Sequence, residues 1–506
     1  MVTSPGSRDT VPTTAGPVKG VIRDDIAMFR SIPFAAPPVG RLRWRPPQPV
    51  TPWDGVRDAT VFGPSCPQTT AFFTPLPAGM SEDCLTLNVW APVAAQANVP
   101  VMVFVHGGAF MNGTSEAGLY DGATFARQGV VLVTANYRLG RFGFFAHPAL
   151  TEEHPDEAKG NFAFMDQIAA LEWVRDNIAE FGGDPGNVTI FGESSGARAM
   201  EAMLIAPAAR RLFHKAIIQS TTHRLAPARP RHSAESIGVA FAESLGLPDA
   251  DADALRAIPV DAVIGGLGQG NAQPTTFSGP MLDGTILTEP YEAAFAHGRI
   301  AAVPLIMGAT DYETAVFNPA AQYDRLMADH AGSLDAIVAN YQKAFPDELD
   351  AKTRFGTDAM FGEPSRFMAR AMATMGQPVF LYRFSYVAEQ LRGRVGGALH
   401  ASELPFTFDT LDKIVESCAS ETWFEKLYAA GFATTDSDQA IADAMNGYWI
   451  DFAKTGDPNG AGRPRWASLT EDTNAMLEFG NGGVTEGSDA TRERYDAWEA
   501  ILAPER

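Results

Sequence analysis

Residues 188–196 read VTIFGESSG, an apolar run that ends in the pattern G-x-S-x-G. The run is rich in β-branched residues, which favour a strand, whereas residues 196–204, GARAMEAML, have the composition of a helix. A serine between such a strand and such a helix is typical of a nucleophile elbow. The turn strains the central residue, and glycines flank it because a Cβ would collide with neighbouring chain. We therefore predict that Ser194 is a nucleophile held above a β-sheet.

The same pentapeptide could be an ordinary strand-to-helix turn, and a second segment favours the catalytic interpretation. Residues 101–105, VMVFV, are typical of a strand buried on both faces of a parallel sheet. Residues 106–110, HGGAF, follow directly, and their small side chains let backbone N–H groups approach a ligand closely. A serine nucleophile requires such donors to stabilise an oxyanion. The two segments together predict a hydrolytic site.

Four segments together resemble the type-B carboxylesterase family, the cholinesterase-like branch of the α/β-hydrolases. They are HGGAF, GESSG, SEDCLTLNVW at residues 81–90, and FGGDP at residues 181–185. The resemblance is greatest to bacterial members of the para-nitrobenzyl esterase type. It begins at residues 32–40 and is still visible at residues 452–459, so it covers nearly the whole chain. It implies an α/β-hydrolase fold and ester hydrolysis that requires neither a metal nor an organic cofactor.

The resemblance also implies which residues are the acid and the base. The family's G-x-x-x-x-E-G segment matches residues 308–314, which makes Glu313 the acid, although Thr314 replaces the final glycine. Asp311, two residues earlier, is the competing carboxylate. The family's G-A-x-H-x-x-E-L-P segment matches residues 397–405, which makes His400 the base. The order Ser194, Glu313, His400 along the chain is the order found in α/β-hydrolases.

In the implied mechanism, Ser194 attacks an ester carbonyl while His400 accepts the serine proton, and Glu313 orients the imidazole. His400 then protonates the leaving alcohol, and water releases the acyl group by the reverse route.

The resemblance places the oxyanion hole at three backbone N–H groups, those of Gly108, Ala109 and Ser195. The family often has alanine at the position of Ser195, but the role requires only the backbone N–H. Phe110 and Met111 follow the oxyanion segment, and we expect them to line an apolar substrate pocket. Either side chain could equally belong to the core.

Apolar runs alternate with helical stretches along the chain, which predicts an α/β fold with a large, mostly parallel sheet flanked by helices. The strand-like runs are residues 101–105, 130–135, 188–191, 216–218, 303–307 and 379–384, and residues 165–174 have helical composition. The chain shows no linker or repeat, so we predict one domain over residues 13–506 after a disordered polar tail, residues 1–12. We expect helical cap insertions near residues 225–300 and 320–375.

The formal net charge of −21 disfavours nucleic acids and anionic membranes as partners. No apolar run approaches the length of a membrane span, and the first residues lack the basic and apolar stretches of a signal peptide. We expect a cytoplasmic bacterial enzyme, with secretion as the alternative. We further expect a monomer or weak homodimer that acts on a small-molecule ester.

The resemblance extends to two structural features. Cys66 and Cys84 match a pair that forms a disulfide in secreted members of the family, although a reducing cytosol would keep them as thiols. Four charged residues resemble the internal ion pairs of the family: Arg43, Glu82, Arg138 and Asp166.

The predicted substrates are small to medium carboxylic esters with apolar acyl or aryl groups. No tryptophan is recognisable at the family's cation-binding position, so we do not expect a preference for choline esters. Aryl carbamates and amides such as anilides are alternative substrates for the same triad. A second class of function is a catalytically inactive adhesion or binding protein, but such relatives have lost the serine or the histidine. This chain keeps all three candidate residues.

Overall fold

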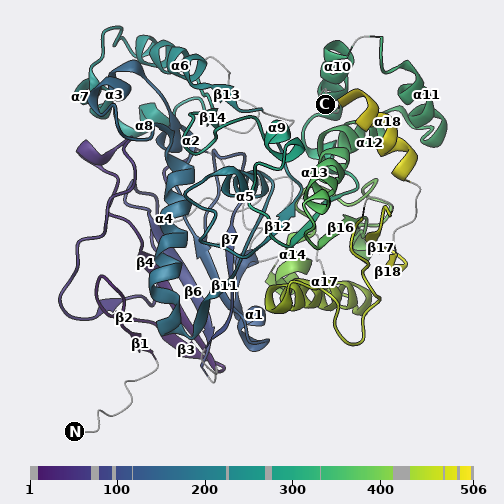
Figure 1. Cartoon of the computed structure of the whole chain (residues 1–506), viewed down its shortest axis with the longest axis horizontal. Helices are drawn as coiled ribbons and strands as arrows, with labels where there is room; N and C mark the ends of the chain where they lie inside the picture. The colour runs from purple at the N-terminus through teal and green to yellow at the C-terminus, as the bar shows by residue number, and fades with distance from the viewer. Residues whose placement is uncertain are drawn as a thin grey trace.

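The computed structural model describes residues 9–69, 79–93, 98–116, 118–223, 227–267, 276–330, 332–413, 433–470, 473–486 and 491–502. These residues form an 11-stranded sheet with helices on both faces (Figure 1). In chain order, its strands are β3 (Val21–Arg23), β4 (Ile26–Pro33), β6 (Thr86–Pro92), β7 (Val99–Val105), β8 (Val131–Ala135), β11 (Gly183–Glu193), β12 (Lys215–Gln219), β15 (Leu305–Thr310), β16 (Val379–Phe384), β17 (Met476–Gly480) and β18 (Gly483–Glu486).

The middle of the sheet is parallel and its edges are antiparallel. The strand order is β18-β17-β16-β15-β12-β11-β7-β8-β6-β4-β3. Every pairing from β17 across to β8 is parallel. Strands β6, β4 and β3 at one edge and β18 at the other pair antiparallel. The predicted mostly parallel α/β sheet is therefore confirmed.

Successive side chains of β7 belong alternately to two hydrophobic clusters, one on each face of the sheet. Val101, Val103 and Val105 belong to one hydrophobic cluster, and Met102 and Phe104 belong to the other. Successive side chains of a strand point to opposite faces, so an uninterrupted apolar run fits a strand covered on both sides. The helices that contribute to the first cluster include α4 (Phe162–Asn177), α5 (Ser195–Ile205) and α13 (Glu363–Thr374). Those that contribute to the second include α1 (Ala123–Arg127), α14 (Leu404–Phe408) and α17 (Asp436–Thr455).

Two groups of helices are inserted between consecutive strands of the sheet, as predicted near residues 225–300 and 320–375. Between β12 and β15 lie α6 (Arg231–Ser244), α7 (Ala252–Arg256), α8 (Val260–Ile264) and α9 (Tyr291–Ala296). Between β15 and β16 lie α10 (Pro319–Asp329), α11 (Asp335–Ala344), α12 (Glu348–Thr357), the π-helical segment η5 (Asp358–Gly362) and α13. The C-terminal helix α18 (Arg492–Leu502) lies beside this second group (Figure 1). The ring centroids of Trp498 on α18 and Phe355 on α12 are 4.7 Å apart.

The remaining α-helices and β-strands are short and lie outside the large sheet. They are β1 (Thr10–Val11), β2 (Val18–Lys19), β5 (Arg57–Asp58), α2 (Gly140–Gly143), β9 (Phe144–Phe145), α3 (Pro148–Glu153), β10 (Gly160–Asn161), β13 (Arg229–Pro230) and β14 (Met281–Leu282). Within the described ranges, every helix is too short or too polar to cross a lipid bilayer.

The prediction that residues 1–12 are disordered is wrong for residues 9–12. Val11 is buried, and β1 pairs antiparallel with β2. The Gly20 N–H also donates to the carbonyl of Asp9. Burial of one apolar side chain and these backbone bonds order a stretch whose composition suggested disorder. Residues 1–8 lie outside the described residues.

The four charged residues matched to internal ion pairs do form two pairs. Arg138 donates to both carboxylate oxygens of Asp166, at 2.8 and 2.7 Å, and both side chains are buried. Arg43 donates to both carboxylate oxygens of Glu82, at 2.7 and 2.5 Å. Planar guanidinium groups match carboxylates in this two-bond geometry, which suits charges removed from water.

Cys66 and Cys84 are buried free thiols. A hydrogen bond with Cys66, together with burial, raises the pKa of the Cys84 thiol well above its ordinary value. The raised pKa favours the uncharged, unreactive thiol form.

We predict that Asp166→Ala strongly destabilises the fold, because it leaves the Arg138 charge buried without its carboxylate. The expected cost is about 3–5 kcal/mol, the usual cost of removing one partner of a buried ion pair. Asp176→Ala is the matched control, since Asp176 pairs with Arg175 on the surface, where an ion pair contributes at most about 1 kcal/mol. Urea unfolding of both variants checks this, and equal unfolding midpoints would contradict it.

Candidate active site

Ser194 lies in the turn between β11 and α5, where the sequence predicts a strand-to-helix turn. Ser194 has φ 60° and ψ −124°, a left-handed conformation that costs a non-glycine residue about 1–3 kcal/mol. A Cβ on Gly192 would lie 2.6 Å from the carbonyl carbon of Gly196, and a Cβ on Gly196 would lie 2.1 Å from the Val105 carbonyl oxygen. Both glycines are therefore required for the close packing of α5 on the sheet. That packing fixes the position of the serine.

The structure brings Ser194, His400 and Glu313 together in one hydrogen-bonded chain. Ser194 Oγ lies 2.8 Å from His400 Nε2, and His400 Nδ1 donates to Glu313 Oε2. The second oxygen of Glu313 accepts from the Thr310 N–H at 2.7 Å and from the Ser220 hydroxyl at 2.6 Å. All three members of the chain are buried, and Ser194 is 5% exposed. The carboxylate is thereby fixed in the orientation that holds the imidazole.

Threonine replaces glycine at position 314 without disturbing this arrangement. Thr314 does not have positive φ, so its backbone does not require a glycine. Its hydroxyl donates to the Thr353 carbonyl at 2.6 Å, and its N–H donates to the Thr357 hydroxyl at 3.2 Å. The side chain thus ties the acid-bearing turn to α12.

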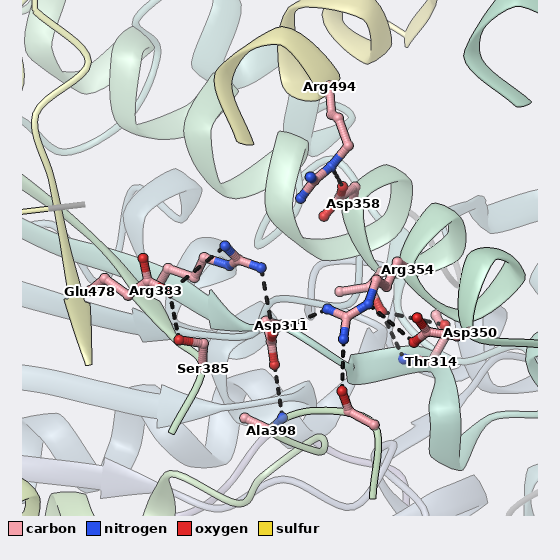
Figure 2. Close-up of polar contacts among 12 residues, drawn as sticks. Asp311, Thr314, Asp350, Arg354, Asp358, Arg383, Ser385, Ala398, Glu478 and Arg494 are labelled. Atoms are coloured by element: carbon pink, nitrogen blue, oxygen red, sulfur yellow. Dashed lines mark hydrogen bonds and ion pairs between the residues drawn. The ribbon is translucent and has the colours of Figure 1, made fainter. Parts of the chain in front are cut away.

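Asp311, the competing acid, has other partners. Its Oδ1 accepts from the Ala398 N–H at 2.8 Å, and its Oδ2 lies 3.2 Å from Arg354 and 3.4 Å from Arg383 (Figure 2). Burial raises the pKa of Asp311, although the two arginines oppose that rise. Of the two carboxylates, Glu313 is the one bonded to the His400 ring.

Three consecutive residues of the oxyanion segment have left-handed backbones: Gly108 at φ 107°, Ala109 at 55° and Phe110 at 60°. The Phe110 N–H donates to the Ser195 hydroxyl at 3.1 Å, which ties the segment to the start of α5. Among the described residues, the N–H groups of Gly108, Ala109 and Ser195 have no hydrogen-bond partner. Ser195 opens α5, so its N–H is also at the positive end of the helix. These three groups are available to bind an anion.

Phe110 and Met111, the predicted pocket residues, lie in different surroundings. Phe110 is only 2% exposed, and its ring centroid lies 4.9 Å from that of Phe144 and 5.6 Å from that of Phe164. The structure therefore favours the core alternative for Phe110. Met111 is half-buried beside it, and a substrate contact for Met111 stays a prediction.

Two further carboxyl groups near the imidazole were missed by the sequence analysis. Glu193 Oε1 lies 3.2 Å from His400 Nε2, and Glu403 is fully buried nearby, where it accepts from Gln219. Burial, and then the other carboxylates, raise the pKa of Glu193 and of Glu403 well above ordinary values. This favours the neutral forms of Glu193 and Glu403. Glu193 is the second residue of the elbow motif, and Glu403 lies three residues after His400. Both carboxyl groups could therefore have been found from their places in the matched motifs.

Aromatic rings cover the imidazole on its other sides. The rings of Phe317 and Phe361 lie 4.9 and 5.5 Å from the His400 ring. Phe361 belongs to the π-helical segment η5, and such segments occur frequently at functional sites. The His400 side chain is fully buried beneath them. Within the described residues, no cluster of three His, Cys, Asp or Glu side chains could hold a metal ion.

Comparison with known proteins agrees with this geometry. The model of the carboxylesterase family matches residues 7–498. The chain belongs to the carboxylesterase family. It is 35% identical to the para-nitrobenzyl esterase of Bacillus subtilis over 92% of this chain and 94% of that protein. It is 34% identical to the phenmedipham hydrolase of Pseudarthrobacter oxydans over 96% of this chain and 98% of that protein. A solved PNB esterase structure superimposes with a TM-score of 0.81 at 32% identity, over 97% of this chain and all of that one.

These matches confirm the α/β-hydrolase fold and the predicted enzyme class. The chain is a serine hydrolase of carboxylic esters.

Proposed function

We propose that the chain hydrolyses small to medium carboxylic esters with apolar acyl or aryl groups, through a triad of Ser194, His400 and Glu313. The observation that carries the proposal is the hydrogen-bonded chain of these residues at a strained elbow. A serine hydroxyl is a weak nucleophile at neutral pH, and this arrangement supplies the base and the acid that it needs.

In the acylation step, Ser194 Oγ attacks the ester carbonyl and its proton moves to His400 Nε2. Glu313 stabilises the imidazolium that forms, and the carbonyl oxygen becomes an oxyanion. The N–H groups of Gly108, Ala109 and Ser195 bind that oxyanion. When the tetrahedral intermediate collapses, His400 returns the proton to the leaving alcohol. Water then attacks the acyl-enzyme with His400 as base, which releases the carboxylic acid and restores Ser194.

The apolar preference is supported by the surroundings of the base. Phe317 and Phe361 border His400, so the surroundings of the base favour an apolar group. The similarity to a para-nitrobenzyl esterase favours esters with an aromatic group in the same way. We further propose that the enzyme works in a reducing compartment such as the cytoplasm, which would keep Cys66 and Cys84 as thiols.

An aryl carbamate or an anilide is the second candidate substrate. One relative is named a phenmedipham hydrolase rather than an esterase, so this family scaffold is associated with more than one named activity. The same triad can attack all three kinds of carbonyl group. Amide cleavage depends more strongly on protonation of the leaving group, which makes it the slowest of the three.

We predict that Ser194→Ala abolishes hydrolysis of short p-nitrophenyl esters, with a loss of about 10⁴-fold or more in kcat, while the fold is kept. Ser195→Ala is the matched control, because the proposed role of Ser195 uses its backbone N–H. That variant loses the acceptor for the Phe110 N–H, a bond that contributes about 1 kcal/mol, so its kcat should fall by less than about tenfold. Substantial activity of a pure, folded Ser194→Ala protein would refute the nucleophile.

A second pair of variants separates the two carboxylates. Glu313→Gln should lower kcat by about 10³- to 10⁴-fold, because an amide cannot stabilise the imidazolium and favours the wrong tautomer. Asp311→Asn should lower kcat by less than about fivefold, because the amide oxygen can still accept from the Ala398 N–H. Steady-state kinetics of both proteins provide the check. If Asp311→Asn proved the more damaged enzyme, Glu313 would not be the acid.

Substrate preference is predicted to favour esters over carbamates and anilides. A panel of p-nitrophenyl esters of graded acyl length, an aryl carbamate and an anilide should give the highest kcat/KM with an ester. Each methylene changes binding to an apolar pocket by only about 1–3 kcal/mol, so the decline with acyl length should be gradual. A carbamate or anilide that exceeded every ester in kcat/KM would replace the proposed substrate class.

A further inference from the structure

The segment that carries His400 lies between β16 and α14, and much of its backbone position is set by the end of β15. The Tyr312 N–H donates to the Ala398 carbonyl at 2.9 Å, and Tyr312 forms an isolated parallel bridge with Leu399. The segments that carry the acid and the base are therefore in direct backbone contact.

The register of this bridge places Asp311 beside Ala398 and Glu313 beside His400. Asp311 accepts a hydrogen bond from the Ala398 N–H, whereas Glu313 accepts one from the His400 ring. Two neighbouring carboxylates thus hold the base at two points, one on the backbone and one on the imidazole.

A single guanidinium connects these segments to α12. Arg354 lies 3.2 Å from Asp311 through Nη1 (Figure 2). It also donates to the Gly396 carbonyl at 2.7 Å through Nη2. Its Nε donates to Asp350, one turn earlier on the same helix, at 3.1 Å. The rigid fork of an arginine can make all these bonds at once, which a flexible ammonium cannot.

The glycines before the base allow this close approach. A Cβ on Gly397 would lie 2.7 Å from Asp311 Oδ1, and a Cβ on Gly396 would lie 2.6 Å from the Tyr312 ring. The side chain of Asp311 is only 9% exposed, and that of Arg354 is 15% exposed. The contact between the two loops is therefore tight, and the Asp311 side chain is largely buried in it.

We propose that Asp311 and Arg354 are positioning residues that hold the backbone of residues 396–398, so that His400 Nε2 stays in line with Ser194 Oγ. This inference rests on the proposed function, in which His400 is the base. Neither residue touches the reacting atoms. Their effect comes through distance, because a displacement of about 1 Å in a catalytic group can cost about 10²-fold in rate.

The test compares Asp311→Ala with Asp311→Asn in steady-state hydrolysis of p-nitrophenyl acetate. The alanine variant loses the acceptor for the Ala398 N–H and should lower kcat by about 10- to 100-fold. The asparagine variant keeps an acceptor oxygen and should stay within about fivefold of the wild type. Because His400 acts in both acylation and deacylation, both steps should slow together, and KM should change by less than about twofold.

Two further variants complete the design. Arg354→Met keeps the apolar stem but loses the bonds to Asp311 and Gly396, and it should lower kcat by about fivefold or more at unchanged KM. If Asp311→Ala does not fold, the kcat of Arg354→Met tests the positioning role in its place. Asp451→Ala is the control: Asp451 on α17 forms a half-buried ion pair with Arg463, and neither residue bonds to the segment that carries His400, so this variant should keep the wild-type kcat. Circular dichroism and melting temperature establish the folded fraction of each protein.

Three results would overturn the inference: a wild-type kcat for folded Asp311→Ala or Arg354→Met, equal losses in the alanine and asparagine variants, or a loss that only follows the folded fraction. Ser194→Ala is measured in the same assay. If Ser194→Ala is inactive while Asp311→Ala and Arg354→Met match the wild type, only the positioning role fails. If Ser194→Ala stays active, the proposed function itself fails.

Discussion

The contact between the start of α5 and the end of β7 is the constraint on which the site depends. Any side chain on Gly196 would lie against the Val105 carbonyl oxygen, so the helix can approach the sheet only with a glycine there. This approach forces Ser194 into its left-handed conformation and brings the N–H of Ser195 beside the segment that follows β7. The close approach at Gly196 thus fixes the positions of Ser194 and of the N–H groups proposed to bind the oxyanion relative to one another.

The parallel sheet also determines where the other proposed functional groups lie, because each of them follows one of its strands. Ser194 follows β11, the oxyanion segment follows β7, Glu313 follows β15 and His400 follows β16. Parallel strands present their carboxyl ends at one edge, where α/β sheets generally bind ligands. The helices inserted after β12 and β15 lengthen the chain between these strands without changing the register of the sheet. Residues separated by about two hundred positions therefore meet in one hydrogen-bonded chain.

Local patterns were sufficient to predict the strands of the sheet centre and the three residues of the hydrogen-bonded chain, because each follows an uninterrupted apolar run or a matched motif. Strand β4, which lies next to the edge strand β3, was missed, since Arg30 and Ser31 interrupt its apolar pattern. Burial of Glu193, and the core rather than pocket position of Phe110, depend on packing between distant segments. The bond from Ala398 to Asp311 likewise depends on a register between loops that are 87 positions apart, which no local pattern specifies.

The central claim is that Ser194 is the nucleophile, and covalent trapping tests it most directly. A p-nitrophenyl phosphonate ester transfers its phosphonyl group to an activated serine and releases p-nitrophenolate, which leaves a stable adduct. We expect one equivalent of p-nitrophenolate for each chain and one modified site, located by peptide mass spectrometry at Ser194. An adduct on another residue, or an enzyme that hydrolyses esters but leaves Ser194 unmodified, would contradict it.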